Sequence, residues 1–273
     1  MKSFLLGKQG YHNVLSLEKR GLKLARTVIV FIFSIIFSGL CFADGLTVAV
    51  ASNAQYVFEE LKMVFVTTEK IPLKGVIGSS GKIVSQIEQG APFDLFLSAD
   101  MEYPQGLYHK GLAPRRPEVY AYGTLVLWTG KKMDLSAGLN ILKSPLIQKI
   151  ALPNPKISPY GRQAVQVLKQ EGLYEAVNKK IVYGESVAQV NQFITLKAVD
   201  IGFTAKSVVR SPRMINQGWW MEIDPETYEP IAQGVVILQY AQEHNLLAAE
   251  KFYAFLFSSR AREIYQKHGY VLP

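Results

Sequence analysis

Short apolar segments typical of strands alternate with helix-like segments from Gly45 almost to the end of the chain. In the first block we expect strands at 46–51, 72–77 and 94–97, separated by segments whose apolar residues recur at helical spacing. Strands separated by helices in this order favour a parallel sheet that is covered by helices on both faces. The sequence therefore predicts the α/β fold class.

The alternation restarts after a further strand candidate at 120–129, which predicts a second block of similar size. Its expected strands are 149–152, 181–183 and 201–204, and its expected helices are 162–171 and 187–196. A last strand is expected at 234–239, followed by two helices.

The two C-terminal helices have no strands of their own, so they need an existing sheet to cover, and the first block is the natural host. The chain then crosses between two lobes twice, near 121–125 and near 232–236. We therefore predict that lobe 1 comprises residues 44–122 plus 235–273 and that lobe 2 comprises residues 123–234.

Residues 1–43 have the composition of a leader. A basic stretch ends at Arg26, and residues 27–40 are uncharged and mostly apolar. This run of roughly 14 residues is shorter than the roughly 20 that a spanning helix needs. Cys41 and Ala43 place small residues three and one before Asp44, which suits a signal peptidase. We expect a signal peptide cleaved after Ala43; a retained membrane anchor or a lipid on Cys41 are the alternatives.

Removal of this leader changes the charge balance. The chain has 30 Lys and Arg against 22 Asp and Glu, and six of these basic residues and one acidic residue lie in 1–43. The remainder therefore carries a net charge of only +3 and has no dense basic stripe, which argues against nucleic-acid binding. The one cysteine, Cys41, leaves with the leader, and the four histidines are scattered. Cysteine nucleophiles, disulfides and histidine metal sites are accordingly not expected.

Small or hydroxyl residues occupy four junctions between an expected strand and the helix that follows it. They are Ser52-Asn53, Ser79-Ser80, Pro159-Tyr160-Gly161 and Glu185-Ser186-Val187. Ligands of open α/β sheets bind at such junctions, where helix N-termini present free N–H groups and the positive end of a dipole. A dianion held there needs no lysine or arginine. The alternative is that Ser52, Asn53, Ser80 and Ser186 are ordinary N-caps, each stabilising by about 1 kcal/mol.

Enzyme and nucleotide motifs fit poorly. Gly75 and the segment 78–82 superficially resemble a P-loop, but Gly81 comes one residue too late and Ile83 replaces the required Ser or Thr. Neither a Gly-x-Ser-x-Gly elbow nor a His-Glu-x-x-His motif is present. Asp94 and Asp100 flank a strand, and we expect structural roles for them, such as capping or pairing with backbone N–H groups.

Several phrases of the sequence, spread from about Leu46 to Tyr270, resemble those of the periplasmic molybdate-binding receptors of ABC transporters. The longest is residues 90–100, from Gly90 to Asp100. The others are Ala51-Ser52-Asn53-Ala54, Gly78-Ser79-Ser80-Gly81, Tyr122-Gly123, Asn154-Pro155, Pro159-Tyr160-Gly161, Gly184-Glu185-Ser186-Val187, residues 200–203 and Tyr228-Glu229-Pro230-Ile231.

The resemblance implies a fold and a ligand set. The implied fold is a two-lobed clamp like that of type II periplasmic binding proteins, with two hinge strands between the lobes. Ser52 and Ser80 match hydroxyl donors of the first lobe, and Asn53 matches an amide donor found in one subgroup. Tyr160 and Val187 match positions whose backbone N–H groups donate from the second lobe. Some members have a tyrosine hydroxyl where this chain has Ala205, and Asn53 is expected to replace that hydrogen bond.

These features together predict a binding protein without catalytic residues, cofactor or bound metal cation. The expected activity is capture of molybdate, or of the similarly sized tungstate, by a monomeric periplasmic receptor that delivers it to the membrane permease of an ABC transporter. Because a site of donors alone suits a deprotonated dianion, Glu185 is expected to face away. A receptor for sulfate or another tetrahedral oxyanion is the first alternative. A secreted enzyme using the same cleft and a ligand-sensing regulator are less favoured.

Overall fold

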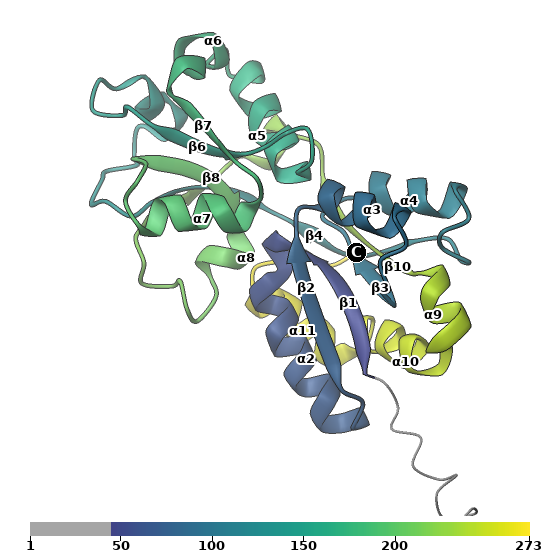
Figure 1. The fold of residues 1–273 in the computed structure, drawn as a ribbon. Coiled ribbons are helices and arrows are strands. Elements are labelled where there is room, and N and C mark those ends of the chain that lie inside the picture. The colour runs from purple at the N-terminus through teal and green to yellow at the C-terminus, as the bar shows by residue number, and fades with distance from the viewer. Residues whose placement is uncertain (1–44) are drawn as a thin grey trace, which may run out of the picture. The chain divides into compact units, whose positions relative to one another are not determined.

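The computed structural model describes residues 45–273, so the predicted leader 1–43 and the cleavage site after Ala43 lie outside the described residues. Within this range the strands form two five-stranded sheets with helices packed against them, seen as two lobes in Figure 1. We call the lobe with β1 (Leu46–Ala51) lobe 1 and the lobe with β6 (Ile150–Pro153) lobe 2. The two-lobed α/β fold is thus confirmed. No helix among the described residues is long and apolar enough to cross a membrane.

The sheet of lobe 1 has the strand order β2-β1-β3-β10-β4. The first three strands are parallel, as expected, whereas β10 runs antiparallel to both of its neighbours. The further bounds in this sheet are β2 Leu73–Gly78, β3 Leu95–Leu97, β4 Glu118–Gly123 and β10 Ile231–Ile237. The helices of this lobe are α2 Gln55–Glu69, α3 Ser80–Glu88, α4 Glu102–His109, α9 Gln239–His244, α10 Leu246–Leu256 and α11 Ser259–Lys267, with the 3-10 helix η1 at Ser52–Ala54.

Alternating residues of β1 divide the core of lobe 1 into two layers. Val48 and Val50 pack with apolar residues of α2, α10 and α11, whereas Ala49 packs with α3 and α4. Successive strand side chains point to opposite faces, so both faces of this sheet are buried. The C-terminal helices therefore cover the first sheet, as we expect from the sequence, and the ring of Phe252 meets the ring of Phe65 edge-on.

The sheet of lobe 2 has the order β7-β6-β8-β5-β9. Its other strands are β5 Leu125–Thr129, β7 Ile181–Gly184, β8 Ile201–Ala205 and β9 Trp219–Glu222. Its helices are α5 Pro159–Gln170, α6 Tyr174–Val177, α7 Val187–Thr195 and α8 Lys206–Val209, with 3-10 helices η2 Gly138–Lys143, η3 Asn178–Lys180 and η4 Pro225–Thr227. The strands β6, β7 and β8 and the helices α5 and α7 match the expected positions. Strand β9 and the helices α4, α6, α8 and α9 are not among the expected elements.

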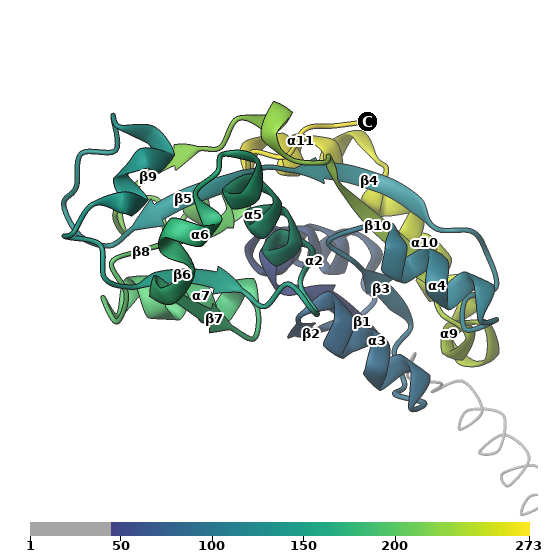
Figure 2. The ribbon, with the colours of Figure 1, turned by 90° about the horizontal axis from the view of Figure 1, so that it is seen from above.

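The chain crosses between the sheets at two places, which Figure 2 shows side by side. The strand expected at 120–129 is in fact two strands, because β4 belongs to lobe 1 and β5 to lobe 2, with Thr124 between them. The return lies in 223–230, earlier than the expected 232–236, since β10 already pairs with β4 at Ile231. Gln233 interrupts the apolar pattern of β10, which explains why the sequence indicates a strand only from Gly234. The predicted boundaries between the lobes, 122/123 and 234/235, fall inside the hinge strands β4 and β10, which belong to the lobe 1 sheet.

The carboxylate of Asp200 fixes the start of β8 to neighbouring segments of lobe 2. It accepts hydrogen bonds from the backbone N–H groups of Gln148 and Lys149 at 2.8 and 2.9 Å, and Lys131 Nζ lies 2.5 Å away. Burial alone raises its pKa, but the bonds from Lys131 and the two N–H groups outweigh burial, so the pKa of Asp200 is lowered. The ionised carboxylate therefore stabilises the fold.

The substitution Asp200→Asn is expected to lower the free energy of unfolding by about 1.5–3 kcal/mol at neutral pH, since hydrogen bonds to a charged group are lost. A carboxyl whose pKa is lowered in the folded state stabilises above its unfolded pKa of about 3.9, and that stabilisation is lost as pH falls through the folded pKa. The difference between variant and wild type, measured by urea unfolding, should stay constant from pH 8 to 5 and shrink below about pH 4. A difference independent of pH would contradict this role.

Candidate anion-binding site

Two of the four expected loops lie at one edge of the lobe 1 sheet. Ser52 begins η1 directly after β1, and Ser80 begins α3 directly after β2. The two strands are parallel neighbours, with Ala51 opposite Gly78, so both helix starts leave the sheet at the same level. Neither serine acts as an N-cap, because each is the first helical residue.

The other two loops are arranged in the same way in lobe 2. Tyr160 is the second residue of α5 after β6, and Val187 is the first residue of α7 after β7. Strands β6 and β7 are parallel, and Pro153 pairs with Gly184 at their ends. Ser186 does cap α7, since its hydroxyl accepts from the Gln189 N–H at 3.3 Å. The capping interpretation is therefore correct for Ser186.

Contacts between the lobes bring the four loops together. The Gly81 N–H, at the start of α3, donates to the Ile157 carbonyl just before α5 at 3.0 Å. The Ser207 hydroxyl of α8 donates to the Asn53 carbonyl at 2.9 Å, and α7 also contacts η1. Alanines of lobe 1 join the lobe 2 core, in a cluster that includes Ala51, Ala99, Tyr160, Val187 and Ala205. The five predicted ligand residues, Ser52, Asn53, Ser80, Tyr160 and Val187, are each at most 3 % exposed.

The side chain of Ser80 has an arrangement suited to donating. Its oxygen accepts a hydrogen bond from the Ala99 N–H at 3.1 Å, which leaves its own proton free. The neighbouring Ser79 hydroxyl is buried without a hydrogen-bond partner. Buried polar groups of this kind are normally satisfied, so hydroxyls that keep a free proton at a helix start indicate a place for an acceptor.

The amide of Asn53 is directed into the protein. Its nitrogen donates to Gln233 Oε1 at 2.7 Å and to the Tyr270 hydroxyl at 3.3 Å, while its oxygen is buried without a hydrogen-bond partner. Both amide hydrogens are used within the protein in this conformation. Direct amide donation from Asn53 to a ligand, which the resemblance implies, therefore stays a prediction. Gln233 and Tyr270 are neighbours of the site that the sequence does not indicate, because they lie 180 and 217 positions from Asn53.

The positively charged side chains that flank the loops are paired with carboxylates of the opposite lobe. Arg162 of α5 bonds Asp100, which follows β3, and reaches Glu102 at 3.0 Å. Lys82 of α3 lies 2.5 Å from Glu185, whose half-exposed side chain faces outward as expected. Burial raises the pKa of Asp100, partly offset by the Tyr103 N–H and the Arg162 charge. The Asp100 carboxylate also accepts a hydrogen bond from the Tyr103 N–H at 3.2 Å, which confirms the structural role expected for Asp100.

Asp94 is likewise structural. Its carboxylate accepts from the Thr47 N–H at 2.7 Å and from the Asn245 amide at 3.0 Å, which joins β1 to the start of α10. Burial raises its pKa more than these bonds and the charge of His244 lower it. Among the described residues no three His, Cys, Asp or Glu side chains cluster as ligands for a cation.

The comparison with protein families matches residues 46–271 to the model described as bacterial extracellular solute-binding protein. The chain belongs to this family. It is 35 % identical to the molybdate-binding protein ModA of Azotobacter vinelandii, over 84 % of this chain and 91 % of that protein. It is 34 % identical to ModA of Rhodobacter capsulatus, over 84 % and 89 % of the two chains. The solved structure of the Azotobacter vinelandii periplasmic molybdate-binding protein is similar, with a TM-score of 0.79, 32 % identity and coverage of 84 % and 99 %.

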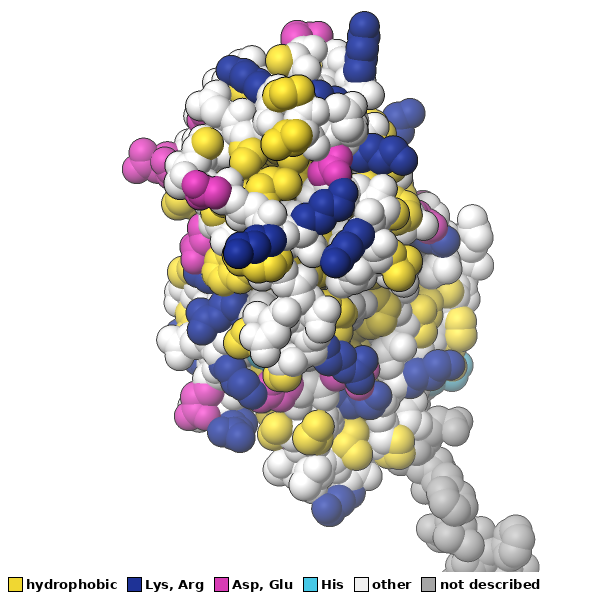
Figure 3. Space-filling model, turned by 90° about the vertical axis from the view of Figure 1, so that its left-hand side faces the viewer, with side chains coloured by type: hydrophobic (Ala, Val, Ile, Leu, Met, Phe, Trp, Pro, Cys, Tyr) yellow, Lys and Arg dark blue, Asp and Glu magenta, His cyan; other side chains and the backbone are white. Residues whose placement is uncertain are grey.

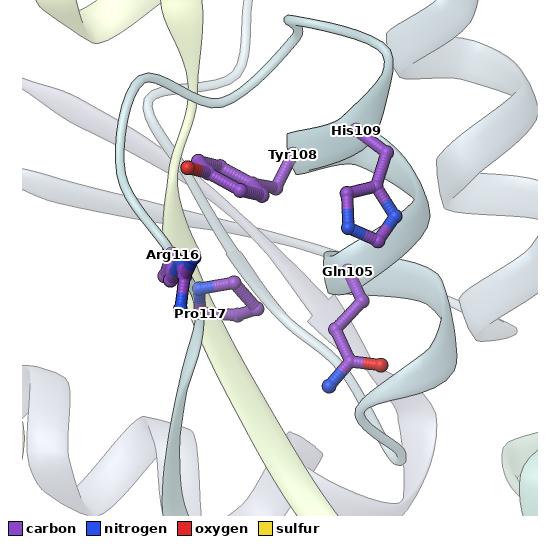
Figure 4. A pocket seen from close by; sticks show the side chains of 5 residues that line it. All are labelled: Gln105, Tyr108, His109, Arg116 and Pro117. Atoms are coloured by element: carbon purple, nitrogen blue, oxygen red, sulfur yellow. The ribbon is translucent and has the colours of Figure 1, made fainter.

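The surface of this solute-binding protein also has features away from the loops. A pocket of about 360 Å³ lies on lobe 1 between α4 and the segment before β4 (Figure 4). It is lined by Gln105, Tyr108, His109, Arg116 and Pro117, none of which belongs to the four loops. On the face drawn in Figure 3, lysine and arginine side chains are spread over both lobes among acidic and apolar ones. The candidate site is therefore the buried junction of the lobes rather than this pocket.

The start of α5 depends on a residue without a side chain. A Cβ added to Gly161 would lie 2.1 Å from the Pro153 carbonyl oxygen, which is closer than any real contact. The substitution Gly161→Ala is expected to lower the free energy of unfolding by about 1–3 kcal/mol because the helix start must move. Gly106→Ala, in α4 with nothing within 4 Å of the added Cβ, should be neutral or slightly stabilising. Equal unfolding curves for the two variants would show that α5 is not held this closely.

Proposed function

We propose that this chain is a periplasmic receptor that captures molybdate between its two lobes and delivers it to the membrane permease of an ABC importer. The family and the relatives named for molybdate binding support this assignment. The observation that carries it is the convergence of four helix starts from two lobes at one buried junction. We further propose that the processed protein acts as a monomer and without a cofactor.

The chemistry of the junction selects a fully deprotonated dianion. Helix starts offer N–H groups and a favourable dipole, and each hydrogen bond to a charged group contributes roughly 1.5–3 kcal/mol. Arg162 and Lys82 are already paired with carboxylates, so the attraction for the ligand comes from neutral donors. Protonated phosphate is normally held by a carboxylate that accepts its proton, and the carboxylate nearest the loops in sequence, Glu185, faces outward. A tetrahedral oxyanion without protons, such as molybdate or tungstate, matches this set.

Closure of the lobes is the step that binding controls. The hydrogen bond from Gly81 to Ile157 and the two ion pairs between the lobes exist only when the lobes meet. A ligand that contacts helix starts of both lobes binds the closed state better, so it shifts the population toward closure. The permease then binds the closed conformation of the receptor, which is populated mainly when the ligand is bound.

Calorimetric titration of the purified protein with molybdate, tungstate, sulfate and phosphate tests the proposal. Molybdate and tungstate should bind most tightly and phosphate weakly or not at all. The substitution Ser80→Ala should weaken molybdate binding by about tenfold or more, because a hydrogen bond to a charged ligand is lost. Ser136→Ala, in an exposed loop of lobe 2, is the control and should bind like the wild type.

Sulfate binding at an affinity equal to that of molybdate would replace the ligand assignment with a general oxyanion receptor. Unchanged molybdate affinity in the Ser80 variant would remove this hydroxyl from the site. Absence of binding to all four anions would contradict the receptor proposal itself.

The two ion pairs between the lobes should contribute unequally to affinity. Arg162 and Asp100 are largely buried, with side chains 31 % and 16 % exposed, whereas Lys82 and Glu185 are about half exposed. The substitution Arg162→Met should weaken molybdate binding about tenfold or more by destabilising the closed state. Lys82→Met should weaken it at most about fivefold, because exposed pairs contribute about 1 kcal/mol or less. Dissociation constants compared at one ionic strength check the ranking, and a larger effect of Lys82→Met would overturn it.

A further inference from the structure

The hinge strand β10 contains a fully buried glutamine, Gln233, at the point where its pairing with β4 shifts register. The side-chain nitrogen donates to the carbonyls of Ala99 at 3.3 Å and Ile231 at 3.2 Å, and the oxygen accepts from the Asn53 amide at 2.7 Å. A buried amide whose nitrogen and oxygen are both bonded is held in one orientation.

Both half-sites of lobe 1 are connected to this side chain. Asn53 follows Ser52 in η1, so the bond from its amide ties the first helix start to the hinge. The Ala99 carbonyl accepts a hydrogen bond from the Gln233 amide, and the Ala99 N–H donates to the Ser80 oxygen at 3.1 Å. Ala99 therefore connects the second helix start to Gln233. Gln233 therefore contacts the supports of both hydroxyl donors without belonging to either loop.

Tyr160, the predicted ligand residue in α5 of lobe 2, also lies next to Gln233. A Cβ added to Gly123, the last residue of β4, would lie 2.1 Å from the Tyr160 hydroxyl and 3.0 Å from Gln233 Nε2. The missing side chain of Gly123 thus leaves the space in which the tip of Tyr160 rests beside Gln233. The Tyr160 hydroxyl is fully buried beside the Asn53 side chain, and burial raises its pKa well above the ordinary value, so it is neutral.

We propose that Gln233 is a positioning residue that couples the hinge to the anion site. It orients the Asn53 and Ser80 supports of lobe 1 and, with Gly123, forms the seat on which Tyr160 comes to rest when the lobes close. This inference rests on the proposed function, because the property it controls is affinity for the oxyanion. Gln233 makes no contact with the anion in this scheme.

A neutral amide is required at this position for a physical reason. Gln233 donates to two carbonyls and accepts from one amide, and glutamate has no N–H with which to donate. A carboxylate here would also place a negative charge near a dianion. Gln233→Glu should therefore weaken molybdate binding more than Gln233→Met, which removes the hydrogen bonds and keeps a similar length.

The first experiment is a double-mutant cycle measured as molybdate dissociation constants by calorimetry, with unfolding temperatures recorded without ligand. Gln233→Met is expected to weaken binding about tenfold in the wild type. In the Asn53→Ala background it should weaken binding by a smaller factor, about threefold, because the route through the Asn53 bond is absent and only the contacts with Ala99 and Tyr160 remain. Gln242→Met, on the exposed side of α9, is the matched control and should leave the dissociation constant unchanged.

An affinity of Gln233→Met within twofold of wild type, or equal effects of this substitution in both backgrounds, would overturn the coupling. So would a lowered unfolding temperature with unchanged affinity, since that is the signature of a purely structural residue. Failure of the wild type to bind any oxyanion would instead contradict the proposed function, and the two failures are therefore distinguishable.

A second pair of variants tests the seat without altering Gln233. Gly123→Ala should weaken molybdate binding by more than tenfold, because the added methyl group occupies the position of the Tyr160 hydroxyl. Tyr160→Phe keeps the backbone donor and should change affinity less than threefold. Combined with Gly123→Ala, it should recover part of the lost affinity, since the removed oxygen makes room for the methyl group. No recovery in the double variant would show that Tyr160 does not rest at Gly123.

Discussion

Unpaired backbone N–H groups at helix starts are the constraint on which the rest of this structure depends. Each helix leaves its first N–H groups without an internal partner, and burial away from water makes that costly. Here parallel strand pairs end at the same level, so β1 and β2 direct two helix starts to one edge of their sheet, and β6 and β7 direct two more. The contacts between the lobes bury all four helix starts together, and in the function proposed above a doubly negative ligand accepts hydrogen bonds there.

Formal charge is used around the site rather than inside it. Arg162 bonds Asp100 and Lys82 pairs with Glu185, so each cation holds the opposite lobe instead of the ligand. A free arginine at the junction would attract most anions. A set of oriented neutral donors contributes binding energy only when the oxygens of the ligand lie where the donors point. In the proposed function this division separates two tasks: the ion pairs stabilise the closed state, and the neutral donors determine which anion is bound.

The sequence predicts most of this fold because local periodicity marks each strand and helix, and the loops at strand ends follow from the α/β order. It does not reveal that 120–129 is two strands in two sheets, since no charged residue or proline marks the crossing at Thr124. Strand β9 is short and only partly buried, which gives no alternating pattern to detect. The partners of Asn53 are invisible for another reason: Gln233 is an isolated polar residue in a buried strand until the fold brings the two together.

The buried amides and hydroxyls near the hinge give the clamp a defined end point. An apolar hinge would pack in several nearly equal ways, whereas Gln233 satisfies its hydrogen bonds only when Asn53, Ala99 and Ile231 hold one arrangement. Oxyanions that carry the same charge differ mainly in size. Discrimination between them therefore requires that the donors of the two lobes be held at fixed distances from one another. The hydrogen bonds of Gln233 hold the donors at these distances. Because Gln233 is neutral, it does so without adding a positive charge that would attract every anion alike.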